Sequence, residues 1–193
     1  LAYPGQVTLV PTGPLTDIAM AIRLEPRLPE LVKRIVLMGG SLGPGNVTPY
    51  AEFNIHADPE AASIVFSSGA PVVMIGLDVT RRVVLDKSKV DHYRRLQSRA
   101  ATMFNAAMTE YIAACKAFGY DWPYMHDPCC IAYLAAPRMF TLATHHIQIE
   151  LKDDRRYGQT IASPARSDAT QVAVAVDQDK FWPLLDRAFA TLP

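Results

Sequence analysis

Carboxylate and amide side chains gather between residues 46 and 54, where the sequence reads NVTPYAEFN. Glu52 and Asn54 stand two apart, so in an extended segment both would project to one face and Phe53 to the other. With Asn46, they would offer amide and carboxylate groups suited to a polyhydroxylated small molecule. A solvated loop with turn-forming polar residues explains the same composition, and the spacing alone does not choose between the two.

An imidazole and a carboxylate stand side by side at His126 and Asp127, directly before Pro128. Asp before Pro is typical of a helix start, where the carboxylate caps free N–H groups, although it can also turn one oxygen toward a hard cation. His126 has an ordinary pKa near neutrality, so it could act as a general acid or simply pack at the surface. Nearby aromatic residues would either stack on a planar ring or wedge the loop onto the core: Tyr120, Trp122 and Tyr124.

The main-chain carbonyl of Thr12 is a further candidate ligand, because Thr12 follows the apolar run QVTLV and lies where a strand would end. As a bare pattern, PTGPLTD indicates only a turn. The glycines at positions 39, 40, 43 and 45 lack the GxGxxG spacing of dinucleotide-binding folds, so such a site is only weakly indicated. The pair Arg81 and Arg82 is most economically interpreted as solvated surface.

Short β-branched runs alternate with helical patterns, which is typical of an α/β fold. Strands are predicted at 6–10, 34–38, 71–79, 147–151 and 171–176. Parallel strands that are buried on both faces read as continuous apolar runs. We therefore predict one domain over residues 1–193, with a mostly parallel central sheet and helices on both faces. Polar residues that follow the strands would meet at the carboxyl edge of this sheet.

Helices are predicted from Thr16 or Asp17, from the cap at Asp58, twice within 87–118, from Pro128, and over 180–190. Pro26 and Pro29 are expected to end the first helix. The segment 41–58 has little periodicity and several early Gly and Pro residues, so it is predicted to be a long loop. Loops of this length in compact domains are often functional.

Composition excludes several classes of protein. The chain has 193 residues with 19 Lys+Arg and 19 Asp+Glu, so no net positive field favours nucleic-acid binding. No run reaches about 18 apolar residues, so no membrane-spanning helix is predicted, and the first ten residues do not resemble a signal peptide. The three cysteines lack zinc or disulfide spacing, so we expect reduced thiols and a cytoplasmic protein, while a reactive cysteine stays open.

Five segments, read in order, resemble the inosine–uridine preferring nucleoside hydrolase family. They are LVPTGPLTDIAMAI, IVLMGGSLGPGNVTPYAEFNIHADPEAA, VVMIGLDVT, MHDPCCIAYL and RYGQTIAS, and they extend over essentially the whole chain. Each fragment alone is weak evidence for the family. The combination of the loop GGSLGPGN with AEFN, DPEAA and a later HDP is highly specific for it. The resemblance implies an enzyme that hydrolyses the N-glycosidic bond of a ribonucleoside to a free base and ribose, with a bound calcium ion.

The resemblance implies four contacts to the sugar. Asn54 would bind ribose hydroxyls on the calcium side, while Asn46 and Glu52 would hold the 5′-hydroxyl. Met38 would pack against the ribose. The expected partner is therefore a small-molecule ribonucleoside, and members of this family commonly assemble as homodimers or homotetramers. The sequence does not identify the preferred base.

For calcium and catalysis, the resemblance implies a main-chain carbonyl ligand from Thr12, a carboxylate ligand from Asp127, and proton donation to the departing base by His126. The family's first strand carries clustered aspartates in a DxDxxxDD-like motif, whose match would lie upstream of Leu1. We therefore expect the N-terminal strand or strands to be missing, the sheet to be open on that side, and calcium binding to be weak or absent. The alternative is a non-catalytic nucleoside- or ribose-binding remnant of the same fold.

Overall fold

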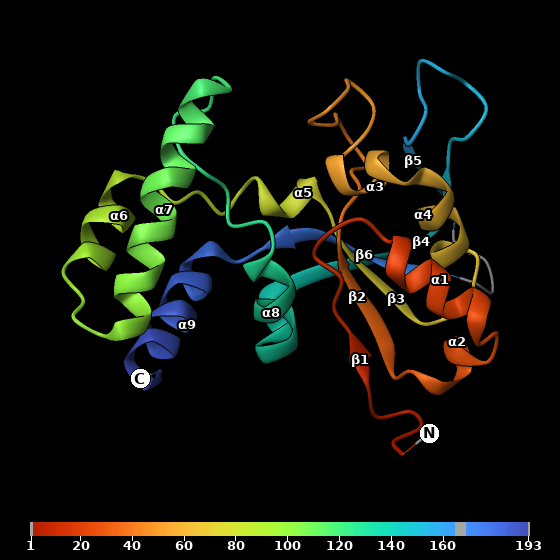
Figure 1. Cartoon of the computed structure of the whole chain (residues 1–193), viewed down its shortest axis with the longest axis horizontal. Helices are drawn as coiled ribbons and strands as arrows, with labels where there is room; N and C mark the ends of the chain where they lie inside the picture. The colour runs from red at the N-terminus through yellow and green to blue at the C-terminus, as the bar shows by residue number, and fades with distance from the viewer. Residues whose placement is uncertain (1, 165–168, 193) are drawn as a thin grey trace.

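The structure, a computed structural model, describes residues 2–164 and 169–192. Its described strands form one sheet in the order β1-β2-β3-β6-β4-β5 (Figure 1). Neighbours from β1 to β6 pair in parallel, whereas β4 runs antiparallel to both β6 and β5. The predicted α/β fold with a mostly parallel sheet is confirmed, and β1 lies at one edge. The strands are β1 (Thr8–Leu9), β2 (Arg34–Met38), β3 (Val72–Ile75), β4 (Phe140–Ile149), β5 (Thr160–Pro164) and β6 (Thr170–Val176).

Alternate side chains of the central strands enter two apolar cores, one on each face of the sheet. On β2, Val36 and Met38 belong to one core, and Ile35 and Leu37 belong to the other. This division follows from the strand period of two residues. Helices α5 to α9 supply the first core, and α1 to α4 supply the second. The predicted helices on both faces are therefore confirmed.

The described helices agree with most of the predicted ones. Residues 87–118 form two helices, as predicted, and the Asp58 carboxylate caps α4 by accepting the amide hydrogen of Ala61 at 3.0 Å. None of the described helices combines the length and the apolar character needed to cross a membrane. The helices are α1 (Thr16–Leu24), α2 (Leu28–Leu31), α3 (Phe53–Ala57), α4 (Pro59–Phe66), α5 (Leu77–Thr80), α6 (Lys87–Arg94), α7 (Arg99–Ala117), α8 (Pro128–Ala135) and α9 (Gln178–Thr191).

Two predictions near the carboxyl edge are wrong. The strand predicted over 71–79 ends at Ile75, and the chain turns into α5. It turns there because Leu77 donates its amide hydrogen to the carbonyl of Gly40 instead of continuing a strand ladder. The segment 41–58 is not a continuous loop, because Glu52 caps the short helix α3.

Two predictions outside the site are also wrong, and one strand was missed. The first helix ends at Leu24, before Pro26, so Pro29 does not end it. Pro29 instead lies in the first turn of α2, where a missing N–H costs no hydrogen bond. Strand β4 begins at Phe140 rather than at residue 147, and β5 was not predicted. Most residues of both strands are partly buried or exposed, and the antiparallel pairing of β4 with β5 and with β6 joins segments that are not adjacent in sequence.

Candidate active site

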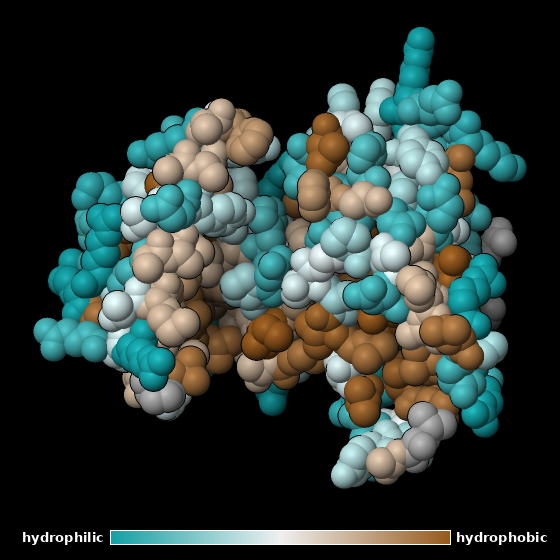
Figure 2. All heavy atoms as spheres, in the orientation of Figure 1, coloured by the Kyte–Doolittle hydropathy of each residue, from teal (hydrophilic) through white to brown (hydrophobic). Residues whose placement is uncertain are grey.

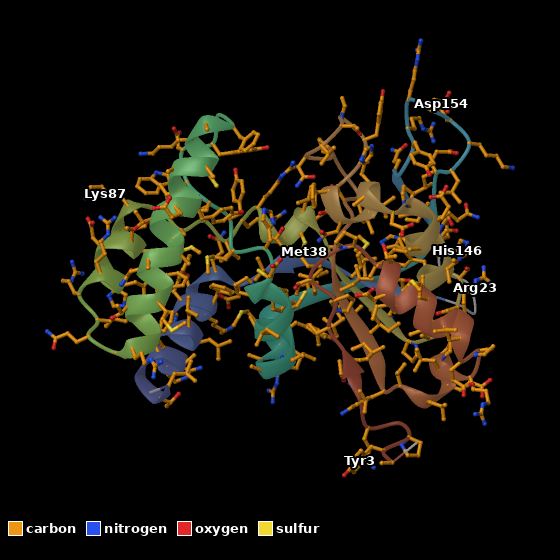
Figure 3. All side chains as sticks on the ribbon, viewed as in Figure 1. Tyr3, Arg23, Met38, Lys87, His146 and Asp154 are labelled. Atoms are coloured by element: carbon orange, nitrogen blue, oxygen red, sulfur yellow. The ribbon has the colours of Figure 1, made fainter. Side chains whose placement is uncertain are left out.

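All seven candidate site residues line one cavity of about 700 Å³. It lies beyond the carboxyl ends of β1 and β2, where open α/β sheets bind ligands. Met38, the last residue of β2, is near the middle of the molecule in Figure 3. The candidates in its lining are Thr12, Met38, Asn46, Glu52, Asn54, His126 and Asp127.

The amide group of Asn54 holds the floor of this cavity together. Its Nδ2 donates to the carbonyl of Met38 at 3.0 Å and more weakly to that of Thr12 at 3.4 Å. Asn54 is 7% exposed. Because both amide hydrogens are directed at carbonyls, Oδ1 is the atom left to accept a hydrogen bond from a ligand hydroxyl.

Glu52 is a buried carboxylate at the N-terminus of α3, with 2% of its surface exposed. Its Oε2 accepts amide hydrogens from Gly40 at 3.0 Å and from Ile55 at 3.1 Å. Burial raises the pKa of Glu52, although these amides oppose the shift. A carboxylate has about four acceptor sites, so Glu52 keeps capacity to accept from a ligand.

The extended arrangement expected for Glu52 and Asn54 is wrong, since Asn54 lies within α3. Glu52 alone is extended, as an N-cap residue requires. Nevertheless Phe53 is 57% exposed while its two neighbours are buried. The change from extended to helical backbone at Glu52 therefore turns Phe53 away from Glu52 and Asn54, as a fully extended segment would.

Asn46 is positioned by its own side chain and by an arginine. Asn46 Oδ1 accepts the amide hydrogen of Phe53 at 2.8 Å, which leaves its NH₂ group as a donor. Arg81 donates to the carbonyls of Pro44 at 3.0 Å and Gly45 at 2.6 Å. The interpretation of Arg81 as solvated surface is wrong, because it lines the cavity and fastens the Asn46 loop. The residue type gave no sign of this, since its partners are main-chain carbonyls.

His126 contacts the buried hydroxyl of Thr80, with Nδ1 and Oγ1 2.7 Å apart. Burial, and secondarily the positive charge of Arg81, lower the pKa of His126 to about 4. The imidazole is therefore neutral at neutral pH and presents one N–H donor and one acceptor. Its ring also packs at 61° against Tyr124, with centroids 5.6 Å apart.

Asp127 does not cap α8, which contradicts the simplest interpretation of Asp before Pro. Its backbone is already helical and its carboxylate makes no cap hydrogen bond. Burial raises the pKa of Asp127. The carboxylate lines the same cavity as Thr12, as a calcium ligand would require.

The described residues do not by themselves fit a calcium ion. Calcium takes about six to eight oxygen ligands, whereas the Thr12 carbonyl and the Asp127 carboxylate supply at most three oxygens. Within residues 2–164 and 169–192, no group of three or more His, Cys, Asp or Glu side chains could hold a metal ion.

Aromatic side chains form the wall opposite the sugar-binding candidates. Tyr120 and Tyr124 line the cavity, whereas Trp122 packs against the apolar core and the Lys116 ammonium, 5.9 Å from its ring centre. Sequence reasoning missed Tyr111 and Phe118 in this wall. Their spacing of seven residues places both on one helical face, which was the available signal.

A second cavity of about 620 Å³ adjoins the first and shares Thr12 and Asp127 with it. Its other lining residues are apolar and come from α8, α9 and Val10, which directly follows β1. Figure 2 shows apolar side chains gathered over β1 and α8 on the visible face. Thr12 and Asp127 therefore lie between the first cavity and this apolar groove.

The cysteine thiols show no sign of reactivity. Cys115, Cys129 and Cys130 are free and buried. Burial raises the pKa of all three, that of Cys129 to about 12, so none is a ready thiolate. The expectation of reduced cysteines agrees with this, and the reactive-cysteine alternative loses its chemical basis.

Comparison with known proteins identifies the family. Residues 1–183 match the inosine-uridine preferring nucleoside hydrolases. The chain is 37% identical over 191 residues to the pyrimidine-specific ribonucleoside hydrolase RihB of Shigella sonnei, covering 96% of this chain and 61% of that protein. A putative RihB of Shigella boydii is also 37% identical, and the match covers 79% of it.

Solved structures agree. A plant nucleoside hydrolase superposes with a TM-score of 0.90 at 30% identity, over 98% of this chain and 64% of that one. A purine-preferring ribonucleoside hydrolase from Gardnerella vaginalis gives a TM-score of 0.85 at 35% identity, over 94% and 59%. The expected resemblance is thereby confirmed, and the chain belongs to the inosine-uridine preferring nucleoside hydrolase family.

Proposed function

We propose that this chain supplies the ribose pocket and the base-side imidazole of a ribonucleoside hydrolase. The reaction would split the bond between the ribose C1′ and a base nitrogen with water, giving ribose and the free base. The observation that carries the proposal is a donor and an acceptor at one end of the cavity, the Asn46 NH₂ group and the Glu52 carboxylate. A sugar hydroxyl both donates and accepts, so this pair matches the 5′-hydroxyl.

The remaining sugar contacts follow from the groups left unpaired. Asn54 Oδ1 would accept from the ribose diol, because its amide hydrogens are taken by main-chain carbonyls. Met38 would pack on the ribose, since its sulfur lies 3.3 Å from Asn54 Nδ2 at the cavity floor. Together these groups would orient the ribose with its anomeric carbon toward His126.

The base would lie between the aromatic wall and His126. Tyr120 and Tyr124 offer ring surface for stacking on a planar base. When the glycosidic bond breaks, its electron pair stays on the base, and an imidazole N–H would stabilise that charge. With a pKa near 4, His126 would do this as a neutral donor rather than as an imidazolium. This refines the role of proton donor expected from the resemblance.

Calcium enters this proposal only as a ligand assignment. Thr12 and Asp127 would give two ligands to an ion that, when bound, would hold the ribose diol and the attacking water. The described residues alone do not complete such a site. A homodimer or homotetramer and a cytoplasmic setting are likewise carried from the resemblance, and sedimentation of the purified chain would measure the assembly.

A matched pair of variants tests the proposal. The 193-residue chain would be incubated with inosine and with uridine, with and without calcium, and free base measured by chromatography. Base release that falls in His126→Ala supports the enzyme. Asn46→Ala should weaken nucleoside binding, while Asn105→Ala, which removes an amide bonded to the Tyr93 carbonyl outside the cavity, should not.

The outcomes separate the two candidate functions. Binding of nucleoside that depends on Asn46 but releases no base would favour the alternative, a non-catalytic ribose-binding chain. Neither binding nor base release, in a chain whose circular dichroism shows it folded, would overturn both.

A further inference from the structure

The side chain that shares a hydrogen bond with His126 is that of Thr80, the last residue of α5. Its Oγ1 lies 2.7 Å from His126 Nδ1, and Thr80 is 0% exposed. No role for Thr80 in the reaction follows from the sugar, base or calcium assignments above. The contact nonetheless determines what the histidine can offer to a ligand, because the two nitrogens of a neutral imidazole have opposite hydrogen-bonding roles.

Two backbone hydrogen bonds hold the segment after Thr80 against the segment before His126. Met125 donates its amide hydrogen to the carbonyl of Val83 at 2.8 Å, and Leu85 donates to the carbonyl of Pro123 at 2.9 Å. These bonds join the segment before His126 to the segment after Thr80 as a short antiparallel bridge. The main chain therefore brings Thr80 and His126 close together, and the contact itself joins their two side chains, with that of Thr80 fully buried.

The proton positions follow from the hydrogen-bond inventory. The threonine hydroxyl has one hydrogen to donate, and Nδ1 is its only hydrogen-bond partner within the described residues. If Nδ1 carried the ring proton, it would donate to Oγ1 and leave the buried hydroxyl hydrogen without an acceptor. If Thr80 donates to Nδ1, the ring proton lies on Nε2. Leaving a buried donor unpaired disfavours the first arrangement by about 5- to 150-fold.

We propose that Thr80 is a positioning residue that holds His126 in the Nε2–H tautomer and thereby presents an N–H donor to the cavity. Nδ1 is occupied by Thr80, and Nε2 has no hydrogen-bond partner among the described residues although His126 lines the cavity. The opposite tautomer would present a lone pair there, which would repel a base that is gaining an electron pair. The consequence for the base rests on the proposed function, whereas the tautomer does not.

Nitrogen NMR of the free chain tests the tautomer without substrate. The histidines would be labelled with ¹⁵N, and the ring nitrogens correlated with ring protons near neutral pH, with His126 assigned by its absence from His126→Gln. Wild type and Thr80→Ser should show Nδ1 unprotonated and Nε2 protonated. Thr80→Val keeps the shape of the side chain but removes the hydroxyl. It should lower the ratio of the Nε2–H to the Nδ1–H tautomer by about fivefold or more.

A second buried threonine supplies the matched control. The hydroxyl of Thr160 is buried without a partner among the described residues, so Thr160→Val should leave the His126 signals unchanged. A proton on Nδ1 in the wild type, or a ratio that Thr80→Val leaves unchanged, would overturn the proposal. If Thr80→Val fails to fold, a proton on Nδ1 in the wild type or in Thr80→Ser would still overturn the proposal, and Thr80→Ala offers a second variant without the hydroxyl.

Kinetics then test the link to chemistry separately. In a preparation that releases base, Thr80→Val should lower kcat about tenfold or more with little change in KM, and Thr80→Ser should restore it. An altered tautomer with an unaltered kcat would overturn the role of Thr80 in the reaction. The absence of base release from the wild type would count against the proposed function and leave the NMR result to stand on its own.

Discussion

Replacing Glu52 by alanine should destabilise the fold far more than removing an exposed helix cap. Glu52 caps α3 through the amide of Ile55, and loss of such a cap costs about 1 kcal/mol. The same oxygen also accepts from Gly40, whose amide would be left without that acceptor at a cost of about 1–3 kcal/mol. The free energy of unfolding should therefore fall by about 2–4 kcal/mol.

The matched control is Asp86→Ala. Asp86 caps α6 through the amide of Lys89 at 3.0 Å, but it is more exposed, and its other side-chain partner is the exposed hydroxyl of Ser88 at 2.7 Å. Its loss should cost about 1 kcal/mol. Urea unfolding followed by circular dichroism would measure both variants at one pH. Equal losses, within about 0.5 kcal/mol, would refute the reasoning that the Gly40 contact stabilises the fold.

Three further predictions concern the site. Because burial raises the pKa of Glu52 above its ordinary value of 4.5, the folded state binds its proton more tightly than the unfolded state. As pH rises from 4.5 through the folded-state pKa of Glu52, the free energy of unfolding of the wild type should therefore fall relative to that of Glu52→Gln, as urea unfolding at several pH values would measure. A rise in this difference would contradict the prediction. A Cβ at Gly45 would lie 2.2 Å from the carbonyl oxygen of Ala51, so Gly45→Ala should cost about 1–3 kcal/mol. Gly43→Ala, whose nearest contact would be 3.9 Å, should cost under about 1 kcal/mol in the same assay. Calorimetric calcium titration of the 193-residue chain should give weak or no binding, and tight binding abolished by Asp127→Asn would refute this.

The parallel part of the sheet was predictable because each of its strands is a continuous apolar run between turn signals. Strand β2 matches its predicted bounds, and β6 differs by one residue. Strand β4 was underestimated, since seven of its residues precede the predicted start and most are only partly buried. Their strand conformation depends on pairing with β6 across a long separation in the chain, which no local pattern encodes.

The candidate residues were predictable as a set, but the local geometry that positions them was not. The resemblance named seven residues that all line the cavity, and simple spacing correctly suggested that Phe53 points away from its neighbours. The free carboxylate of Asp127 contradicts the capping rule, because the residue is already helical. Arg81 was assigned to the surface and Thr80 was not singled out, because their partners are carbonyls and a ring nitrogen distant in sequence.

The short helix α5 connects the two ends of the cavity. Asp78 accepts the amide hydrogen of Leu42 at 3.0 Å, so the start of the sugar loop is tied to the helix. Arg81, directly after the helix, fastens the same loop through two carbonyls. Thr80, between them, contacts His126. Because Asp78 and Thr80 of α5 and Arg81 directly after it hold both the Asn46 loop and His126, a shift of α5 would move the two together. On the proposed function, substitutions there should couple sugar affinity to departure of the base.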